Sequence, residues 1–207
     1  MVIPKIKICG LISVEDAQIL NRNQVEYAGI VLFYPKSKRN NEMNQAKRIL
    51  AALDPEVKKV AVTVSPSMEQ VREIEAAGFD ILQVHGTLFD EVLDGTRLDI
   101  FRAFHVDGEK IDQPDSNSDK VIGYVFDGKI PGQGEVFDWS NIRFFDRKQK
   151  LLMLAGGLNN QNVQDGIAYI SPDIVDVSTG VEKKDGTGKD EEKVRIFVEM
   201  ARTRDDS

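Results

Sequence analysis

The chain alternates short apolar runs with longer segments of helical period. Eight runs rich in apolar and β-branched residues recur along it, at residues 6–9, 29–33, 59–64, 81–85, 100–104, 121–126, 151–155 and 174–178. Several of them are almost continuously apolar, which is typical of parallel strands that are covered on both faces. The pattern therefore predicts eight buried strands.

Helical signals fill most of the intervals between these runs. Ser13 with Asp16, and Ser67 with Gln70, have the spacing of capping boxes, and the second segment continues with apolar residues three or four apart until Gly78. A last segment starts at Asp190 with acidic residues in its first turn, followed by apolar residues at helical spacing. Strand and helix thus alternate as far as the C-terminus.

This alternation predicts an α/β fold, a (β/α)8 TIM barrel, because eight parallel units close a sheet without leaving an edge. An open doubly wound sheet is the alternative, but residues 9–11 lack the GxGxxG fingerprint expected after its first strand. Residues 105–119 have no clear apolar period, so the fifth helix is expected to be short or missing. We expect one barrel domain over residues 1–203 and a disordered tail at 204–207.

Composition narrows the classes of function. With 41% hydrophobic and 29% charged residues, the 207-residue chain can bury one sizeable core. A formal net charge of −7 argues against binding to nucleic acid or to an anionic membrane. No stretch approaches the ~20 apolar residues of a membrane span, and the single cysteine cannot form an internal disulfide. A cytoplasmic location is therefore expected.

Two strand ends carry residues suited to an anion. Gly156 and Gly157 follow the seventh strand, and Ser178, Thr179 and Gly180 follow the eighth. Glycine lets backbone N–H groups approach a phosphate, hydroxyl groups add donors, and barrels commonly bind phosphate at these two loops. Either glycine pair alone would also fit a tight turn. Together they predict a small phosphorylated ligand.

Two other candidate sites are weaker. The sequence GTGKD at residues 186–190 resembles the end of a P-loop, but Asp190 stands where serine or threonine is required. His85 and His105 are far apart in the sequence and have no paired ligand spacing, so no metal site is expected.

Six short motifs, in this order and at these separations, resemble the phosphoribosylanthranilate isomerase family. They are KICGL (7–11), FYPKSKR (33–39), QVHG (83–86), FDWS (137–140), LAGGL (154–158) and VDVSTGVE (175–182). The resemblance covers nearly the whole chain. It implies a (β/α)8 barrel that acts in tryptophan biosynthesis and converts N-(5-phosphoribosyl)anthranilate to 1-(2-carboxyphenylamino)-1-deoxyribulose 5-phosphate by an Amadori rearrangement. It implies no metal and no cofactor.

The resemblance also implies roles for three residues. Cys9 would be the general base, Asp127 the general acid, and Arg39 the ligand of the anthranilate carboxylate. A thiol needs a lowered pKa to serve as a base near neutrality, and we expect the start of the Ser13 helix to supply that shift. Asp127 must stay protonated, so its surroundings should be apolar or should include another negative charge. Without the resemblance, these residues fit a buried packing position, a turn and a solvated loop.

Some positions depart from the family pattern. Residues 131–135 replace a more glycine-rich run, Arg102 stands where lysine is common, and residues 183–187 lengthen the loop after the eighth strand. A related isomerase of histidine biosynthesis would be expected to use paired aspartates, and an indole-glycerol phosphate synthase a set of catalytic lysines. A non-catalytic phosphate-binding barrel would keep the glycine loops without needing Cys9 or Asp127. These alternatives are disfavoured by the residues present.

Overall fold

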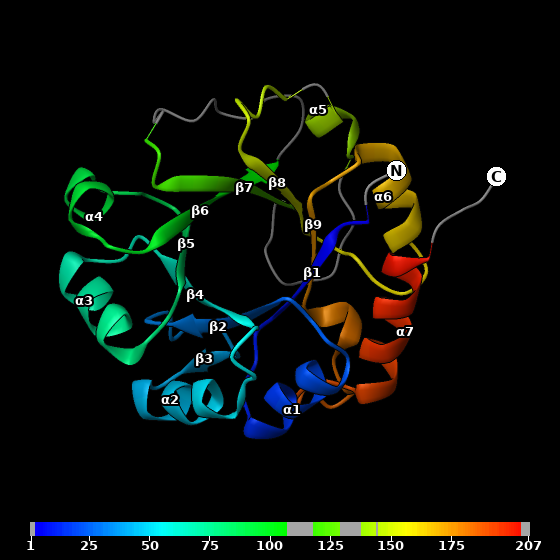
Figure 1. Cartoon of the computed structure of the whole chain (residues 1–207), viewed down its shortest axis with the longest axis horizontal. Coiled ribbons are helices and arrows are strands. Elements are labelled where there is room, and N and C mark those ends of the chain that lie inside the picture. The colour runs from blue at the N-terminus through cyan, green and yellow to red at the C-terminus, as the bar shows by residue number, and fades with distance from the viewer. Residues whose placement is uncertain (1–2, 107–117, 129–137, 144, 204–207) are drawn as a thin grey trace.

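A computed structural model describes residues 3–106, 118–128, 138–143 and 145–203. Its strands form one sheet (Figure 1). They are β1 (Lys5–Cys9), β2 (Tyr27–Leu32), β3 (Asn40–Asn41), β4 (Lys58–Val64), β5 (Ile81–His85), β6 (Asp99–Val106), β7 (Val121–Gly128), β8 (Leu151–Leu154) and β9 (Ile174–Val177).

The sheet closes into an eight-stranded barrel. Its order is β1-β9-β8-β7-β6-β5-β4-β2-β3, and the additional pairing of β1 with β2 closes the ring. All of these pairings are parallel. The short strand β3, which the sequence did not predict, pairs with β2 outside the ring. The predicted (β/α)8 barrel and its eight strands are confirmed.

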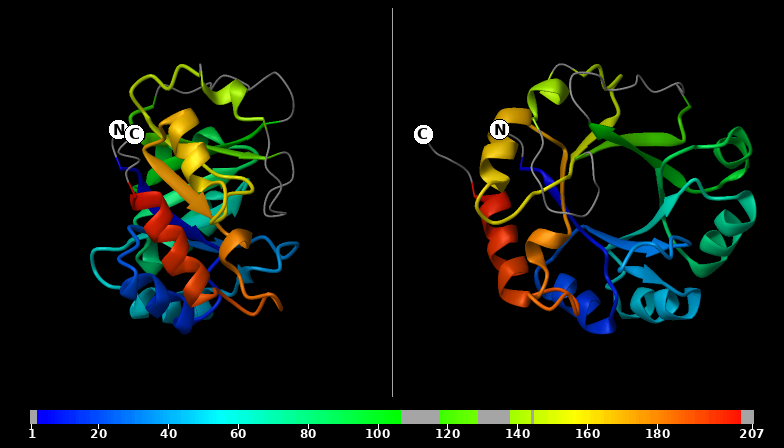
Figure 2. Two further views of the ribbon diagram at one scale, coloured as in Figure 1. Left: turned by 90° about the vertical axis from the view of Figure 1, so that its right-hand side faces the viewer. Right: turned by 180° about the vertical axis from the view of Figure 1, so that it is seen from behind.

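Helices surround the ring of strands (Figure 1), and α6 and α7 lie side by side on one flank (Figure 2). They are α1 (Val14–Arg22), α2 (Met43–Ala52), α3 (Met68–Ala77), α4 (Asp90–Gly95), α5 (Ser140–Arg143), α6 (Val163–Ile170), the 3-10 helix η1 (Thr179–Val181) and α7 (Glu191–Arg202). The predicted capping boxes at Ser13 and Ser67 are both present, and Gly78 ends α3 with a left-handed φ of 88°.

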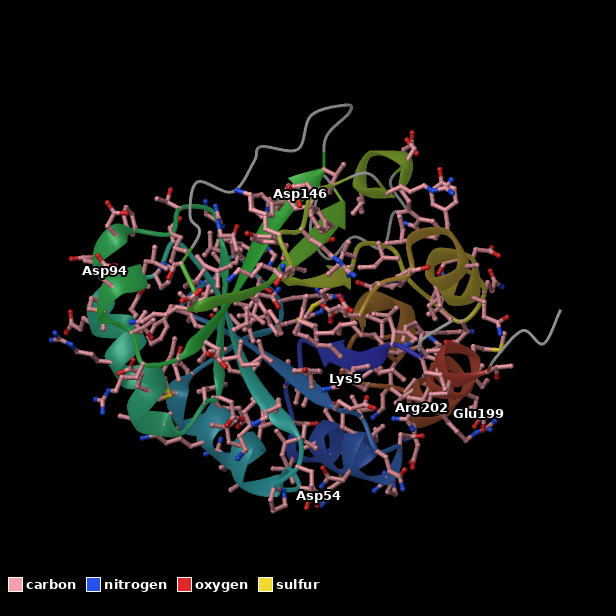
Figure 3. The ribbon with its side chains drawn as sticks, turned by 45° about the horizontal axis from the view of Figure 1, so that its top comes forward. Lys5, Asp54, Asp94, Asp146, Glu199 and Arg202 are labelled. Atoms are coloured by element: carbon pink, nitrogen blue, oxygen red, sulfur yellow. The ribbon has the colours of Figure 1, made fainter. Side chains whose placement is uncertain are left out.

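Burial follows the alternation of side chains along each strand. One apolar cluster, which includes Val62, Phe101, Val125 and Met153, fills the inside of the barrel. A larger cluster packs the outer faces of the strands against the helices. Charged side chains such as Asp54, Asp94 and Glu199 lie on the periphery (Figure 3). This division leaves the inward positions near the carboxyl ends of the strands available for polar residues.

Some expectations concern residues that the structure does not describe. The short or missing fifth helix falls on residues 107–117 and the disordered tail on residues 204–207, so both stay predictions. The departure at residues 131–135 also lies there. Within the described ranges, no helix combines the length and the apolar character needed to cross a membrane.

Candidate active site

A cavity of about 660 Å³ opens at the carboxyl ends of the barrel strands. It brings together every residue that the sequence singled out for chemistry or binding: Cys9, Arg39, Asp127, Gly156, Gly157, Ser178, Thr179 and Gly180. These residues come from the ends of β1, β7, β8 and β9 and from the loop after β2. Because the strands are parallel, their carboxyl ends meet at one rim, which is where TIM barrels carry their active sites.

The two glycine loops lie against each other. Gly156 and Gly157 have φ angles of 76° and 70°, a left-handed conformation that favours glycine. A Cβ atom on Gly180 would lie only 2.2 Å from the carbonyl oxygen of Leu158, so the loops after β8 and β9 can approach this closely only with glycine there. The Ser178 hydroxyl donates to the Cys9 carbonyl oxygen at 2.9 Å, which ties the second loop to β1.

The thiol of Cys9 is half-buried and faces Gly29 on the neighbouring strand. A Cβ atom at Gly29 would lie 2.9 Å from the Cys9 sulfur and 3.2 Å from the Lys7 nitrogen, so glycine at this position leaves room for both groups. Burial raises the pKa of Cys9, whereas Lys7 and Lys189 act to lower it and Asp176 adds to the rise.

The expected lowering of the Cys9 pKa by the Ser13 helix is therefore wrong, because the net shift is upward. The start of α1 is closed by its own side chains: Asp16 accepts hydrogen bonds from the N–H groups of Ile12 and Ser13, and Ser13 accepts one from Asp16. This carboxylate offsets the positive end of the helix where it forms. The groups that favour the thiolate are instead two buried lysines, Lys7 on the same strand and Lys189 from the loop after β9.

Sequence reasoning missed a buried ion pair that lies next to Cys9. Lys7 has no exposed surface, and its Nζ lies 2.8 Å from Oδ2 of Asp176 on the adjacent strand β9. Burial lowers the pKa of Lys7, but Asp176 and Cys9 together raise it by more, so its net shift is upward and the ammonium stays charged. The available signal was a single charged residue within each of two otherwise apolar runs, residues 6–9 and 174–178.

Asp127 lies near the end of β7 and faces the same cavity. Burial and the neighbouring Asp176 raise its pKa to about 6, although a hydrogen bond of 2.8 Å from the Gly128 N–H to Oδ1 opposes the shift. These are the surroundings that the sequence analysis expected for this residue, which combine burial with a second negative charge.

The two histidines meet in the structure despite their separation in the sequence. Their rings stack with centroids 5.3 Å apart, and Nδ1 of His85 lies 3.5 Å from Nε2 of His105. Gln83 contacts the other ring nitrogen of His85 at 2.9 Å. Burial lowers the pKa of His85 to about 3, so it is neutral near pH 7. No cluster of potential metal ligands occurs among the residues that the structure describes.

Arg39 extends from the loop after β2 toward the loop after β9. Its Nε donates to Oε1 of Glu182, and its Nη2 donates to the Thr179 hydroxyl at 2.8 Å. Burial alone would raise the pKa of Glu182, but Arg39, Lys189 and Lys38 together lower it to about 2. The guanidinium is thus held by an ionised carboxylate at the edge of the cavity.

Arg102, one of the departures from the family pattern, lies behind the cavity wall, where its charge acts on His85 and His105. Its Nη1 donates to the carbonyl oxygens of Val84 and Ala103, and its guanidinium lies 5.3 Å from the centre of the Phe104 ring. It does not line the cavity.

Comparisons with known proteins agree with this geometry. Residues 6–200 match the family model for N-(5'phosphoribosyl)anthranilate (PRA) isomerase. The N-(5'-phosphoribosyl)anthranilate isomerase of Clostridium kluyveri is 37% identical over 200 residues, covering 96% of this chain and 98% of the relative. That of Streptococcus pneumoniae is 36% identical over 199 residues, covering 96% of each chain.

Solved structures give the same result. The phosphoribosyl anthranilate isomerase of Thermus thermophilus superposes with a TM-score of 0.84 at 28% identity, over 95% of this chain and 97% of that one. Another phosphoribosyl anthranilate isomerase, solved in complex with reduced 1-(o-carboxyphenylamino)-1-deoxyribulose 5-phosphate, has a TM-score of 0.78 at 30% identity. That match covers 96% of this chain and 98% of the other.

Proposed function

We propose that Cys9 is the general base and Asp127 the general acid of this chain, which belongs to the N-(5'-phosphoribosyl)anthranilate isomerase family and is an enzyme of tryptophan biosynthesis. The observation that carries the proposal is the placement of these two side chains in one cavity, on β1 and β7. The strands between them, β8 and β9, end in the two glycine loops. A ribose held there by its phosphate would lie between thiol and carboxyl group.

The proposed reaction proceeds by proton transfers alone. Asp127 protonates the ring oxygen O4′, the bond from O4′ to C1′ breaks, and the nitrogen lone pair forms an iminium ion. The Cys9 thiolate then removes the proton from C2′ and yields a neutral enolamine, which ketonises to the product. Acid and base act on different atoms of one substrate, so each must be held within reach of its own atom. No step requires a metal or a cofactor.

Binding of the substrate is assigned to the rest of the cavity. Backbone N–H groups of Gly156, Gly157 and Gly180, with the hydroxyls of Ser178 and Thr179, would hold the phosphate. The complex of a solved relative with a ribulose 5-phosphate derivative supports a phosphorylated ligand. The planar guanidinium of Arg39 suits the anthranilate carboxylate, because it can form two parallel hydrogen bonds. We assign the barrel domain to residues 1–203.

Alkylation provides a direct test, because Cys9 is the only cysteine of the chain. Iodoacetamide should inactivate the enzyme in proportion to the modification of Cys9, measured by intact mass. The rate of modification should rise with pH as the thiolate forms. The reaction product should protect the thiol by filling the cavity. Full activity after complete modification would show that the thiol takes no part in proton transfer.

Arg39→Lys should raise KM more than it lowers kcat. The guanidinium already uses Nε and Nη2 for Glu182 and Thr179, and its remaining N–H groups can bind a carboxylate. A lysine has one nitrogen and cannot satisfy these partners and the substrate together. Steady-state kinetics would measure the change.

Two controls separate this effect from a general loss of structure. Inhibition by inorganic phosphate should change far less than KM in Arg39→Lys, because the backbone N–H groups of Gly156, Gly157 and Gly180 do not depend on Arg39. Arg195→Lys, which alters an exposed arginine paired with Glu192 and Glu199 on α7, should leave KM and kcat unchanged. An effect of Arg39→Lys on kcat alone would assign Arg39 to another role.

A further inference from the structure

Asp176 is a buried carboxylate beside Cys9 and Asp127 that the acid–base mechanism described above does not use. It is 7% exposed and lines the cavity. Its Oδ2 accepts from Lys7, but no described residue donates to its Oδ1, which is fully buried. A buried carboxylate oxygen without a donor is costly in free energy, so it points to a partner that arrives with the substrate.

The position of Asp176 relates it to both proposed catalytic groups. Its charge acts on Cys9 and on Asp127. Only β8 separates β9 from β7, and the first residues after β8 that line the cavity are small, Ala155, Gly156 and Gly157. On the other side, β9 pairs directly with β1, with Asp176 opposite Lys7. Asp176 thus lies on the arc of the barrel wall between acid and base.

The proposed reaction leaves one proton without an acceptor. When the enolamine ketonises, the hydroxyl at C2′ becomes a carbonyl group, so its proton must leave O2′. Asp127 has meanwhile given its proton to O4′, which keeps it in the product, and must be reprotonated before the next turnover. Cys9 cannot supply both needs, because it carries the proton that moves from C2′ to C1′.

We propose that Asp176 is a further catalytic residue whose Oδ1 accepts the O2′ proton during ketonisation and then returns it to Asp127. This inference rests on the proposed function. As the O2′–H bond breaks, the C2′=O bond forms. The electron pair of the enolamine double bond then binds, at C1′, the proton that the Cys9 thiol held. This regenerates the thiolate. The proton on Asp176 then restores the acid form of Asp127. No proton is gained or lost over the cycle.

The electrostatics of Asp176 are consistent with this duty. Burial raises its pKa, and Lys7 and Lys189 oppose the shift without reversing it. A carboxylate with a raised pKa accepts a proton more readily than an exposed one. Lys7, held at 2.8 Å from Oδ2, fixes the carboxylate so that Oδ1 is the free oxygen. Lys7 is accordingly a positioning residue for Asp176.

Asp176→Asn tests the inference, because an amide keeps the shape but cannot take up this proton. We expect kcat to fall by about 10² with KM changed only a few-fold. Ketonisation should become the slow step, so the enolamine should accumulate in single-turnover experiments on this variant and be detected by its absorbance. It should not accumulate in Cys9→Ser, where removal of the C2′ proton is slow.

Two further variants make the result decisive. Asp173→Asn removes a carboxylate that pairs with exposed Arg147 just before β9, at the opposite end of the strand from the cavity, and should leave kcat unchanged. If Asp176→Asn fails to fold, the double variant Lys7→Gln with Asp176→Asn avoids an unpaired buried ammonium, and the enolamine should accumulate in it too. An unchanged kcat, or a lowered kcat with no enolamine detected, would overturn the inference. Neither result would touch the roles of Cys9 and Asp127, which their own variants test.

Discussion

Cys9→Ser is expected to lower kcat by about 10² or more while KM changes only a few-fold. Serine keeps nearly the size of cysteine, but its hydroxyl is far too weakly acidic to give a useful base near neutral pH. The phosphate loops and Arg39 do not depend on the sulfur atom, so substrate binding should persist. Steady-state kinetics on the purified variant would measure both constants.

Cys9→Ala is the matched control for a packing role. If Cys9 were only a buried packing residue, serine and alanine would differ in their effect on stability, and both variants would retain turnover. If the thiol is the base, both should lose kcat to a similar degree, with thermal unfolding showing that the barrel is intact. Near-normal turnover of Cys9→Ser would contradict the mechanism.

Asp127→Asn should also lower kcat by about 10² or more, because the amide has no proton to give to O4′. Its side-chain oxygen can still accept the Gly128 N–H, so the local geometry should be retained. Binding of inorganic phosphate should be unchanged, which provides the control for an intact cavity. A kcat within a few-fold of the unmodified enzyme would exclude Asp127 as the acid.

The dependence of kcat/KM on pH gives this variant a second readout. The reactive form has Asp127 protonated and Cys9 ionised, so the pair carries one proton. With the pKa of Asp127 raised to about 6 and that of Cys9 raised above its ordinary value, both groups are protonated below about pH 6 and both are deprotonated above the pKa of Cys9. The share of the one-proton form is constant between these limits.

Unmodified enzyme should therefore lose kcat/KM below about pH 6 and again at high pH. In Asp127→Asn the thiolate is the one remaining requirement, so the residual activity should rise with pH through the pKa of Cys9. A profile of the unmodified enzyme that rises steadily through that pKa would mean that a protonated Asp127 is not needed. The two profiles together assign each limb to a group.

Local sequence determined the framework of this protein. Apolar runs that alternate with helical periods specify strands and helices, because side chains repeat every two residues in one and about every 3.6 in the other. Caps such as Ser13 and Ser67 mark helix starts through contacts only three residues apart. The positions of Cys9, Asp127 and the glycine loops followed as well, since parallel strands bring their carboxyl ends to one rim.

Tertiary structure alone decided the chemical surroundings of those residues. Lys7 and Asp176 are 169 positions apart, and His85 and His105 lie on different strands, so no local spacing announces either contact. The pKa of Cys9 depends on how deeply the thiol is buried and on which charges surround it, and here burial outweighs Lys7 and Lys189. Desolvation and Coulomb interactions act between atoms that are close in space, whatever their distance along the chain, and the closed barrel sets that closeness.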